Sequence, residues 1–321
     1  MREELLLQTI NLQKYFDVPK GKLHAVDNVN IEIKKGRTLG VVGESGCGKT
    51  TLGRTVLGLL PATGGQIIFD GQDITKMSPK QFKALRKDMQ IIFQDPYSSI
   101  NPRHSLKKTI GEPLLVNGII KNRRAREEKV RELMEVVGLS ARLENSYPHE
   151  LDGGRRQRVG IARALAVSPK FIVCDEPVSA LDVSVQAQVL NLLMDLQQQM
   201  DLTYMFISHD LSVVRHISTD IAVMYLGQCV EMAPSQKLFE DPKHPYTKAL
   251  ISAIPIPSAK AREVETEIIR GEIISPVNPA PGCRFASRCP YATEACTERD
   301  VPLALTDDEH YVACNLYNDK E

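Results

Sequence analysis

The sequence lacks an excess of either charge and lacks any long apolar run. Its 40 lysines and arginines balance 40 aspartates and glutamates, so no general field attracts nucleic acid or an anionic membrane surface. No stretch reaches the roughly eighteen apolar residues that a membrane-spanning helix needs. We therefore expect no nucleic-acid partner, and any contact with a membrane is expected to pass through a protein partner.

The start of the chain also lacks the features of a secretory signal. The opening residues, MREELLLQTI, carry acidic side chains where a signal has basic ones, and their apolar stretch is short. We therefore expect a cytosolic protein. With 321 residues and 42% hydrophobic content, the chain is large and apolar enough for two domains, or three, with a folded core.

Strand-like segments predict an α/β fold. Residues 5–93 contain an Asp70-Gly71 turn and short β-branched runs, which predict a sheet with an antiparallel edge: IEI at 31, TLGVVG at 38, QIIF at 66 and MQIIF at 89. Strand signals return in FIVCDE from Phe171 and in TYMFIS from Thr203. The apolar helical pattern between these two strands restores the strand-helix-strand order of a parallel sheet.

A helical insertion is expected at about residues 98–158. Strand signals disappear there, and apolar residues recur at i, i+3, i+4 and i+7: Val130, Leu133, Met134 and Val137. The run KNRRAREEKVRE from Lys121 could suggest a nucleic-acid site. Its acids are interleaved, however, and Glu127 stands four residues before Arg131, so we interpret the run as a solvated helix face.

The chain changes character after about Glu240. Prolines recur, regular periodicity fades, and four of the seven cysteines gather there: Cys283, Cys289, Cys296 and Cys314. We expect a separate C-terminal module at residues 241–321. Because the cytosol keeps thiols reduced, the clustered cysteines suggest a metal site rather than disulfides.

A phosphate loop is predicted between the apolar run LGVV and helix-forming residues. Its pattern is G-x4-G-K-[ST], and its residues are Gly43, Glu44, Ser45, Gly46, Cys47, Gly48, Lys49, Thr50 and Thr51. The glycines let backbone N–H groups converge on phosphate oxygens, Lys49 supplies positive charge, and Thr50 offers a hydroxyl to Mg²⁺. Cys47 is interpreted as a small loop residue. A glycine-rich turn that merely caps a helix would not need lysine and threonine in register.

Two acidic residues follow the strand pattern FIVC. A phosphate loop needs a carboxylate at a strand end for magnesium, and we assign that role to Asp175. Glu176 comes next, where a carboxylate can polarise an attacking water, so we assign it as general base. His209, in ISHD after the next strand, is a candidate to contact the γ phosphate. Lys49, Glu176 and His209 are thus the predicted catalytic side chains.

The order of these motifs resembles that of the ABC transporter ATPases over nearly the whole chain. The matching segments are the phosphate loop, Gln94 after MQIIF, the signature segment LDGG, CDEP, the D-loop SALD and ISHD. The signature segment consists of Leu151, Asp152, Gly153 and Gly154, and the D-loop of Ser179, Ala180, Leu181 and Asp182. The resemblance implies a P-loop NTPase (RecA-like) core with an antiparallel β subdomain and an α-helical insertion, within residues 1–240.

The resemblance also implies ATP and Mg²⁺ as ligands. Gln94 would join Thr50 and Asp175 around Mg²⁺ and sense the membrane subunit. An aromatic near the N-terminus would stack on adenine, and spacing favours Phe16, with Tyr15 as the alternative. Members of this family dimerise head to tail, so that the signature segment of one subunit closes over ATP held by the other and hydrolysis releases the pair.

Three further segments narrow the resemblance to the ATPases of oligopeptide and dipeptide importers: FQDPYSSINPR from Phe93, HPYTKAL from His244 and NPAPGCRFASRCPYATEAC from Asn278. This implies two transmembrane permease subunits, an extracytoplasmic substrate-binding protein, and a peripheral position at the cytoplasmic face of the cell membrane. ATPases of nickel and oligosaccharide importers stay open as alternatives, because the other subunits select the solute.

The signature segment departs from the LSGGQ of that family. Asp152 stands in place of Ser, and Arg155 in place of Gln. A carboxylate repels phosphate, so one interpretation is a weakened signature in a chain that pairs with a different ATPase. The other is that Asp152 turns away and caps the helix that begins near Gly153.

The four clustered cysteines are separated by five, six and seventeen residues, unlike the paired C-x2-C of most structural zinc sites. Four thiolates can hold zinc or an iron–sulfur cluster. The spread spacing, the Cys289-Pro290 pair, and Arg284 and Arg288 as counter-charges favour [4Fe–4S], with zinc as the alternative. We expect a structural role for this group in a proline-rich segment, and redox sensing stays open.

Two other classes of function fit the sequence less well. A soluble ABC ATPase acting on DNA or ribosomes is expected to show a long coiled coil, a second phosphate loop or a basic footprint, and this sequence has none of them. A redox sensor that holds nucleotide only as a structural ligand would not need Glu176.

Overall fold

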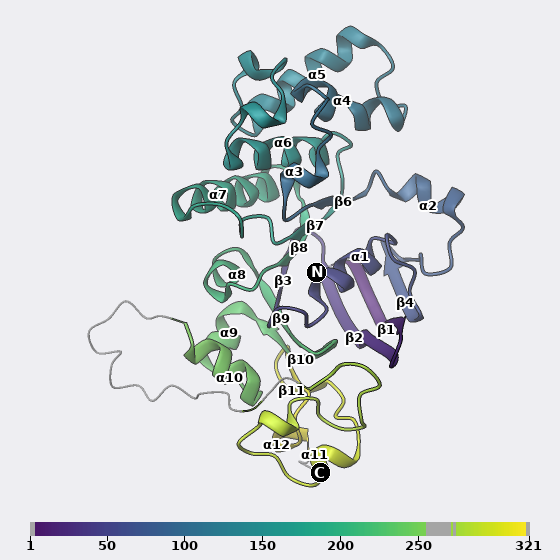
Figure 1. Cartoon of the computed structure of the whole chain (residues 1–321), viewed down its shortest axis with the longest axis vertical. Helices are drawn as coiled ribbons and strands as arrows, with labels where there is room; N and C mark the ends of the chain where they lie inside the picture. The colour runs from purple at the N-terminus through teal and green to yellow at the C-terminus, as the bar shows by residue number, and fades with distance from the viewer. Residues whose placement is uncertain (1–3, 255–270, 272–273, 319–321) are drawn as a thin grey trace, which may run out of the picture. The chain divides into compact units, whose positions relative to one another are not determined.

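The computed structural model describes residues 4–254, 271 and 274–318 (Figure 1). The chain forms two compact units. The first unit comprises Met1–Lys76 and Ile207–Glu321, and the second comprises Met77–Phe206. The first unit is therefore built from both ends of the chain, whereas the second is one continuous segment.

An antiparallel sheet of the first unit has the strand order β2-β1-β4-β5. Its strands are β1 (Leu5–Val18), β2 (Gly21–Lys34), β4 (Gly64–Phe69) and β5 (Gln72–Asp73). The predicted turn joins β4 to β5, and both Asp70 and Gly71 have positive φ, at 49° and 76°. Positive φ at two central residues matches the right-handed twist of a tight hairpin. The predicted antiparallel strands are therefore present, but they form a sheet of their own rather than an edge of the sheet that contains residues 38–42.

The second group of strands in the first unit runs in the order β11-β12-β10-β9-β3. The strands are β3 (Thr38–Val42), β9 (Asp220–Tyr225), β10 (Gln228–Pro234), β11 (Ala304–Asp307) and β12 (His310–Val312). β3 pairs with β9 in parallel, while β12 pairs with both β10 and β11 in antiparallel fashion. The C-terminal strands β11 and β12 thus extend a sheet of the first unit. The domain boundary expected at residue 241 stays a prediction.

The helices of the first unit are short. They are α1 (Lys49–Val56), α8 (Leu211–Ile217), α9 (Ser235–Glu240), α10 (Pro245–Ser252), α11 (Ala295–Glu298) and α12 (Asn315–Asn318), with a 3-10 turn at Ala286–Arg288. α1 begins directly after the glycine-rich loop that follows β3, in the strand-loop-helix order that the sequence predicts.

The second unit contains the three strands β6 (Met89–Ile92), β7 (Phe171–Asp175) and β8 (Thr203–Ile207), whose last residue belongs to the first unit. β6 and β7 pair in parallel, and every residue of β7 and β8 is buried. The helices are α2 (Pro79–Leu85), α3 (Pro96–Ser99), α4 (Leu106–Val116), α5 (Arg123–Val136), α6 (Gly153–Leu165) and α7 (Val183–Met200), with 3-10 turns at Ala141–Leu143 and Pro148–Glu150.

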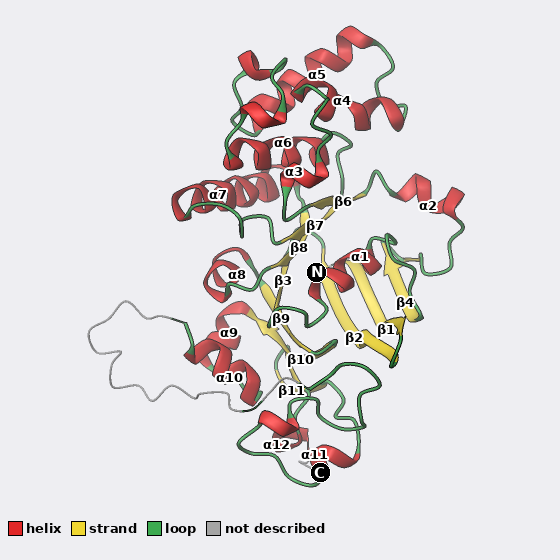
Figure 2. Ribbon diagram, viewed as in Figure 1, coloured by secondary structure: helices red, strands yellow, loops and turns green. Residues whose placement is uncertain are grey.

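The predicted helical insertion is present as α3 to α6 (Figure 2). α6 contacts α3, α4, α5 and α7, and it continues seven residues past the expected boundary, to Leu165. On the charged face of α5, Glu127 pairs with Arg123 and Arg131 pairs with Glu144, in place of the expected pair of Glu127 with Arg131. Within the described residues, no helix is both long and apolar enough to cross a membrane.

Candidate active site

The glycine-rich loop between β3 and α1 fits closely against two backbone segments of the first unit. Gly43 has φ 148°, and a Cβ there would lie 2.1 Å from the carbonyl oxygen of Met224 in β9. Gly48 has φ 103°, and a Cβ there would lie 2.0 Å from the carbonyl oxygen of Ala25 in β2. A side chain at either position would collide with backbone, so the loop can hold this shape only with glycine there.

Lys49 lies inside this loop and is almost fully buried. Its ammonium group donates hydrogen bonds to the carbonyl oxygens of Gly43, at 2.7 Å, and Glu44, at 3.0 Å. The thiol of Cys47 is buried beside it, and burial raises the pKa of that thiol. Cys47 is thus a small buried loop residue, as predicted, and Lys49 supplies the positive charge of the loop.

The first turn of α1 begins at Lys49, after the N-cap residue Gly48. Thr50 lies in this turn and is partly buried. The free N–H groups of a helix N-terminus and a neighbouring ammonium group together bind phosphate oxygens. The loop, Lys49 and Thr50 therefore have the arrangement of a phosphate-binding site.

Asp175 and Glu176 follow β7 in the second unit. Asp175 is only 3% exposed at the end of the strand. Glu176 has φ 47°, in the left-handed region, which costs a non-glycine residue about 1–3 kcal/mol and is typical of functional positions. Its carboxylate accepts a hydrogen bond from the side-chain amide of Gln94 at 3.0 Å. The same amide lies 3.4 Å from the hydroxyl of Ser179, so these three predicted site residues lie together.

The signature segment forms the start of α6. Asp152 is the N-cap residue, and its carboxylate accepts a hydrogen bond from the Arg155 N–H at 2.7 Å. The guanidinium of Arg155 also lies 3.4 Å from that carboxylate. The predicted cap is therefore confirmed, and the positive charge at Arg155 partly offsets the negative charge at Asp152.

The two signature glycines pack against the D-loop region of the same unit. A Cβ on Gly153 would lie 3.1 Å from Leu181, and one on Gly154 would lie 2.5 Å from Val185. The short separations bring the N-terminus of α6 against residues 181–185. A side chain at Gly154 would therefore collide with Val185 in the first turn of α7.

The two aromatic candidates near the N-terminus have different surroundings. The Tyr15 ring stacks on His24 with 3.9 Å between ring centroids, and its hydroxyl bonds the carboxylate of Asp27. Burial and that carboxylate raise the pKa of Tyr15. Phe16, on the other face of β1, has the Lys14 ammonium 4.8 Å from its ring centroid. Because one face and the hydroxyl of Tyr15 are engaged, Phe16 stays the prediction for an adenine-stacking residue.

His209 lies in the first unit, exposed in the loop between β8 and α8. The next residue, Asp210, is the N-cap of α8 and accepts hydrogen bonds from Ser212 N–H, at 2.8 Å, and Val213 N–H, at 3.3 Å. The cap fixes the backbone beside the histidine. The contact of His209 with a γ phosphate stays a prediction.

The four clustered cysteines line one cavity of about 110 Å³, together with residues such as Phe285 and His244. Burial and the other three thiols raise the pKa of Cys283 to about 11. Burial and neighbouring thiols also raise the pKa of Cys314. A bound cation would favour the thiolate forms, so the chemistry of the four side chains fits a thiophilic metal or cluster.

Arg284 and Arg288 do not serve as the expected counter-charges of the cysteine cavity. The Arg284 guanidinium bonds the carboxylate of Asp27 and the carbonyl oxygen of Leu226. The Arg288 guanidinium lies 3.2 Å from the carboxylate of Glu44. Each arginine therefore pairs with an acid from the N-terminal part of the first unit.

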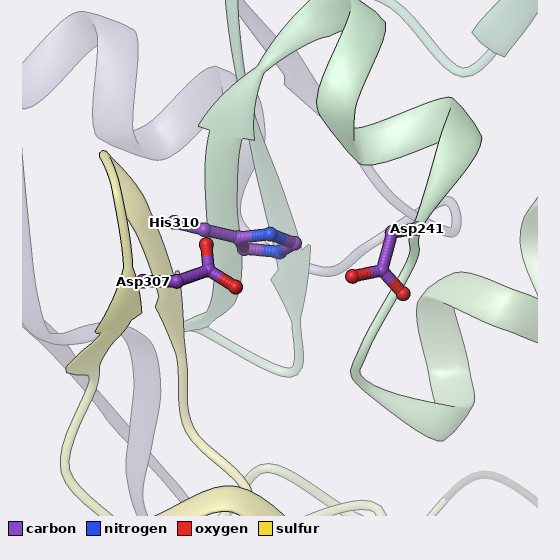
Figure 3. Close-up of side chains that lie close together, drawn as sticks. All are labelled: Asp241, Asp307 and His310. Carbon is purple, nitrogen blue, oxygen red and sulfur yellow. The ribbon is translucent and has the colours of Figure 1, made fainter.

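A second group of possible metal ligands lies near the end of β10. The carboxylates of Asp241 and Asp307 face the ring of His310 (Figure 3), and their ligand atoms lie within 4.8 Å of one another. Lys237 and Lys243 already form ion pairs with Asp307 and lower its pKa to about 2. We interpret this group as an ion-pair network, because a metal ion would have to displace two ammonium groups.

Comparison with known proteins shows the family of this chain. A family model described as ABC transporter matches residues 26–179, and one described as oligopeptide/dipeptide transporter, C-terminal region, matches residues 230–296. The chain is 48% identical to the oligopeptide transport ATP-binding protein AppF of Bacillus subtilis (strain 168), over 98% of each chain. It is also 48% identical to the oligopeptide transport ATP-binding protein OppF of Haemophilus influenzae, over 97% of each chain.

A solved structure supports the same assignment. The dimeric, post-hydrolysis ATP-binding cassette MJ0796 bound to ADP and Pi aligns with a TM-score of 0.66 and 26% identity, over 72% of this chain and 99% of its own. The sheets and helices of this chain therefore have the arrangement of an ABC ATPase cassette, a fold of the P-loop NTPase type. With a phosphate loop, a strand-end acid pair and a capped signature segment in this order, the chain belongs to the ATP-hydrolysing subunits of the ABC transporter family, in the group that carries the oligopeptide/dipeptide transporter C-terminal region.

Proposed function

We propose that this ATPase drives the import of dipeptides or oligopeptides from the cytoplasmic face of the cell membrane. The observation that carries the proposal is the 48% identity to oligopeptide transport ATP-binding proteins over nearly the full length, C-terminal region included. Two transmembrane permease subunits would convert closure of the ATPase pair into opening of the channel, and an extracytoplasmic binding protein would deliver the peptide.

The site residues divide into binding and chemical roles. Lys49 and the loop amides would hold the β and γ phosphates, while Thr50, Gln94 and Asp175 would hold Mg²⁺. Glu176 would accept a proton from the attacking water, and His209 would contact the γ phosphate. The bond between Gln94 and Glu176 supports this assignment, because it keeps the carboxylate beside a predicted Mg²⁺ ligand.

The partner ATPase in this proposal is a different chain. A serine at the cap position can accept the helix N–H and donate its own O–H to a γ phosphate, whereas an ionised aspartate can only accept. Asp152 makes the cap but lacks the donor. The pair would therefore contain unequal sites, with a weakened signature facing the partner's ATP.

Replacing Asp152 by serine tests this asymmetry. We expect Asp152→Ser to raise ATP turnover of the assembled complex about tenfold, because one hydrogen bond to a charged phosphate is restored. The melting temperature should stay unchanged, since serine and aspartate cap helices equally well. Steady-state ATPase assays and thermal melting measure the two effects. An unchanged turnover would mean that Asp152 is only a cap.

We further propose that the four cysteines hold a [4Fe–4S] cluster. Their separations of five, six and seventeen residues differ from the paired C-x2-C of most structural zinc sites. All four line one cavity, and a cluster would supply covalent cross-links to a segment rich in proline.

Purification from the native membrane tests the transport proposal. We expect two permease subunits and a second ATPase to co-purify, and peptides loaded on the binding protein to stimulate ATP turnover in reconstituted vesicles. Nickel and an oligosaccharide serve as matched alternative solutes in the same assay. Stimulation by one of these instead of peptides would reassign the solute, and the absence of any permease subunit would overturn the importer proposal.

A further inference from the structure

Glu44 of the phosphate loop is held by the C-terminal part of the chain. Its backbone N–H donates a hydrogen bond to the Tyr246 hydroxyl at 2.9 Å. Its carboxylate accepts hydrogen bonds from Arg288 at 3.2 and 3.3 Å, and its carbonyl accepts one from Lys49 at 3.0 Å. The two C-terminal side chains and the phosphate-binding lysine therefore meet on one loop residue.

Both C-terminal side chains are themselves fixed. Tyr246 is fully buried in α10, and its ring packs against Tyr225 and Phe285 with centroids 4.7 and 5.4 Å away. The Arg288 side chain is 9% exposed, donates to the Tyr225 hydroxyl at 3.2 Å, and lies 6.0 Å from the Phe285 ring centroid. Rigid aromatic neighbours leave these two groups few other positions, so the loop at Glu44 has a fixed support.

A second contact supports the opposite end of the loop. Arg284 bonds the carbonyl oxygen of Leu226, and the N–H of the next residue, Gly227, donates to the Cys47 carbonyl at 2.8 Å. Arg284 and Arg288 both lie in the cysteine-bearing segment. Residues of this segment thus support the phosphate loop at Glu44 and, through residues 226–227, at Cys47.

Tyr246 and Arg288 are not among the residues assigned to metal binding or to proton transfer. They contact the loop residue Glu44 instead. We expect these contacts to fix the shape of the loop before and during binding. Their loss should therefore change the affinity for ATP more than the rate at which bound ATP is hydrolysed.

We propose that Arg288 and Tyr246 are positioning residues for the phosphate loop, and that they set the affinity of this subunit for ATP through Glu44. The proposal needs only ATP binding by the loop and is independent of the transported solute and of the group held by the cysteines. Loss of either contact allows Glu44 to move, and Lys49 moves with it because its ammonium bonds the Glu44 carbonyl.

The test measures binding of Mg-ATP to the purified full chain by calorimetry, together with kcat and KM. We expect Arg288→Gln to raise the Kd and KM about fivefold and to leave kcat within about twofold, since one charge-assisted hydrogen-bond pair is lost. Arg288→Lys should recover part of the affinity, because it keeps the charge. Arg124→Gln is the matched control, an exposed arginine paired with Glu128 on α5, and it should change nothing.

Two further variants show that the effect passes through Glu44. Glu44→Ala combined with Arg288→Gln should bind ATP no more weakly than Glu44→Ala alone, because alanine has already removed the carboxylate that Arg288 contacts. Tyr246→Phe keeps the buried ring and should also raise the Kd, so it carries the test if Arg288→Gln fails to fold. An unchanged Kd in folded Arg288→Gln or Tyr246→Phe, or full additivity with Glu44→Ala, would overturn the proposal.

Discussion

Replacing Glu176 by glutamine should abolish turnover while ATP stays bound. The amide cannot accept a proton from water, and removal of a general base costs on the order of 100-fold to 10,000-fold in rate. The Gln94 amide now donates to one carboxylate oxygen of Glu176 at 3.0 Å, and it can donate in the same way to the side-chain oxygen of a glutamine there. We therefore expect the two side chains to keep their positions. We expect Glu176→Gln to lose at least about 100-fold in kcat, with the Kd for Mg-ATP changed by less than about threefold.

The matched control for this variant is Glu128→Gln. Glu128 is an exposed glutamate of the same unit, paired with Arg124 on the surface of α5. It should leave kcat and Kd unchanged, because exposed pairs contribute little and lie away from the acid pair of β7. Undiminished hydrolysis by Glu176→Gln would remove Glu176 as the base. Loss of binding together with turnover would indicate that Glu176 holds the metal ion instead.

Substitution of one cysteine of the cavity should empty the proposed cluster site. After anaerobic purification we expect about four iron and four sulfide per parent chain, with the broad visible absorbance of a cluster, and less than about one iron in Cys289→Ser. The segment around residues 282–314 should then become sensitive to proteases, because a structural metal stabilises the fold of the segment that binds it, by roughly 10 kcal/mol or more in zinc-finger peptides. Metal analysis, absorbance and limited proteolysis measure these effects.

Cys229→Ser is the matched control for the cluster. This thiol is buried in β10, outside the cavity, where burial keeps it protonated by raising its pKa to about 12. Its loss should leave iron and sulfide unchanged. Stoichiometric zinc without sulfide in the parent would replace the cluster by a zinc site, and four free thiols would remove the metal proposal altogether.

The nucleotide-binding elements were predictable because their chemistry is local in sequence. The phosphate loop needs a strand, glycines and a helix within a few residues, and these are β3, the loop and α1. The cap at Asp152 is equally local, since the side chain bonds an N–H three residues ahead. Patterns of this kind can be read from the residues alone, as can the buried runs of β7 and β8.

The C-terminal strands were not predictable for the opposite reason. β12 has only three residues, too few to show a strand pattern in the sequence. His310 pairs with the buried Glu231 of β10 at 2.7 Å, and hydrophobic periodicity does not predict such a contact. The partners of Arg284 and Arg288 lie more than 240 positions earlier, at Asp27 and Glu44. The sequence signals for these contacts were the HPY segment, which contains Tyr246, and the two arginines beside cysteines. Because the arginines stand next to cysteines in the sequence, we expected them to offset a cluster charge, whereas they pair with Asp27 and Glu44.

The contacts that shape the phosphate loop come from residues far along the chain, and this affects the order of events during synthesis. The loop at residues 43–51 emerges from the ribosome early, but Met224, Gly227, Tyr246 and Arg288, which hold it in shape, emerge much later. At about 5–20 residues per second, the delay is on the order of 10–50 s. Throughout that interval the nascent chain has the nucleotide motif without these contacts, so we expect the loop to bind ATP more weakly until residue 288 has been added.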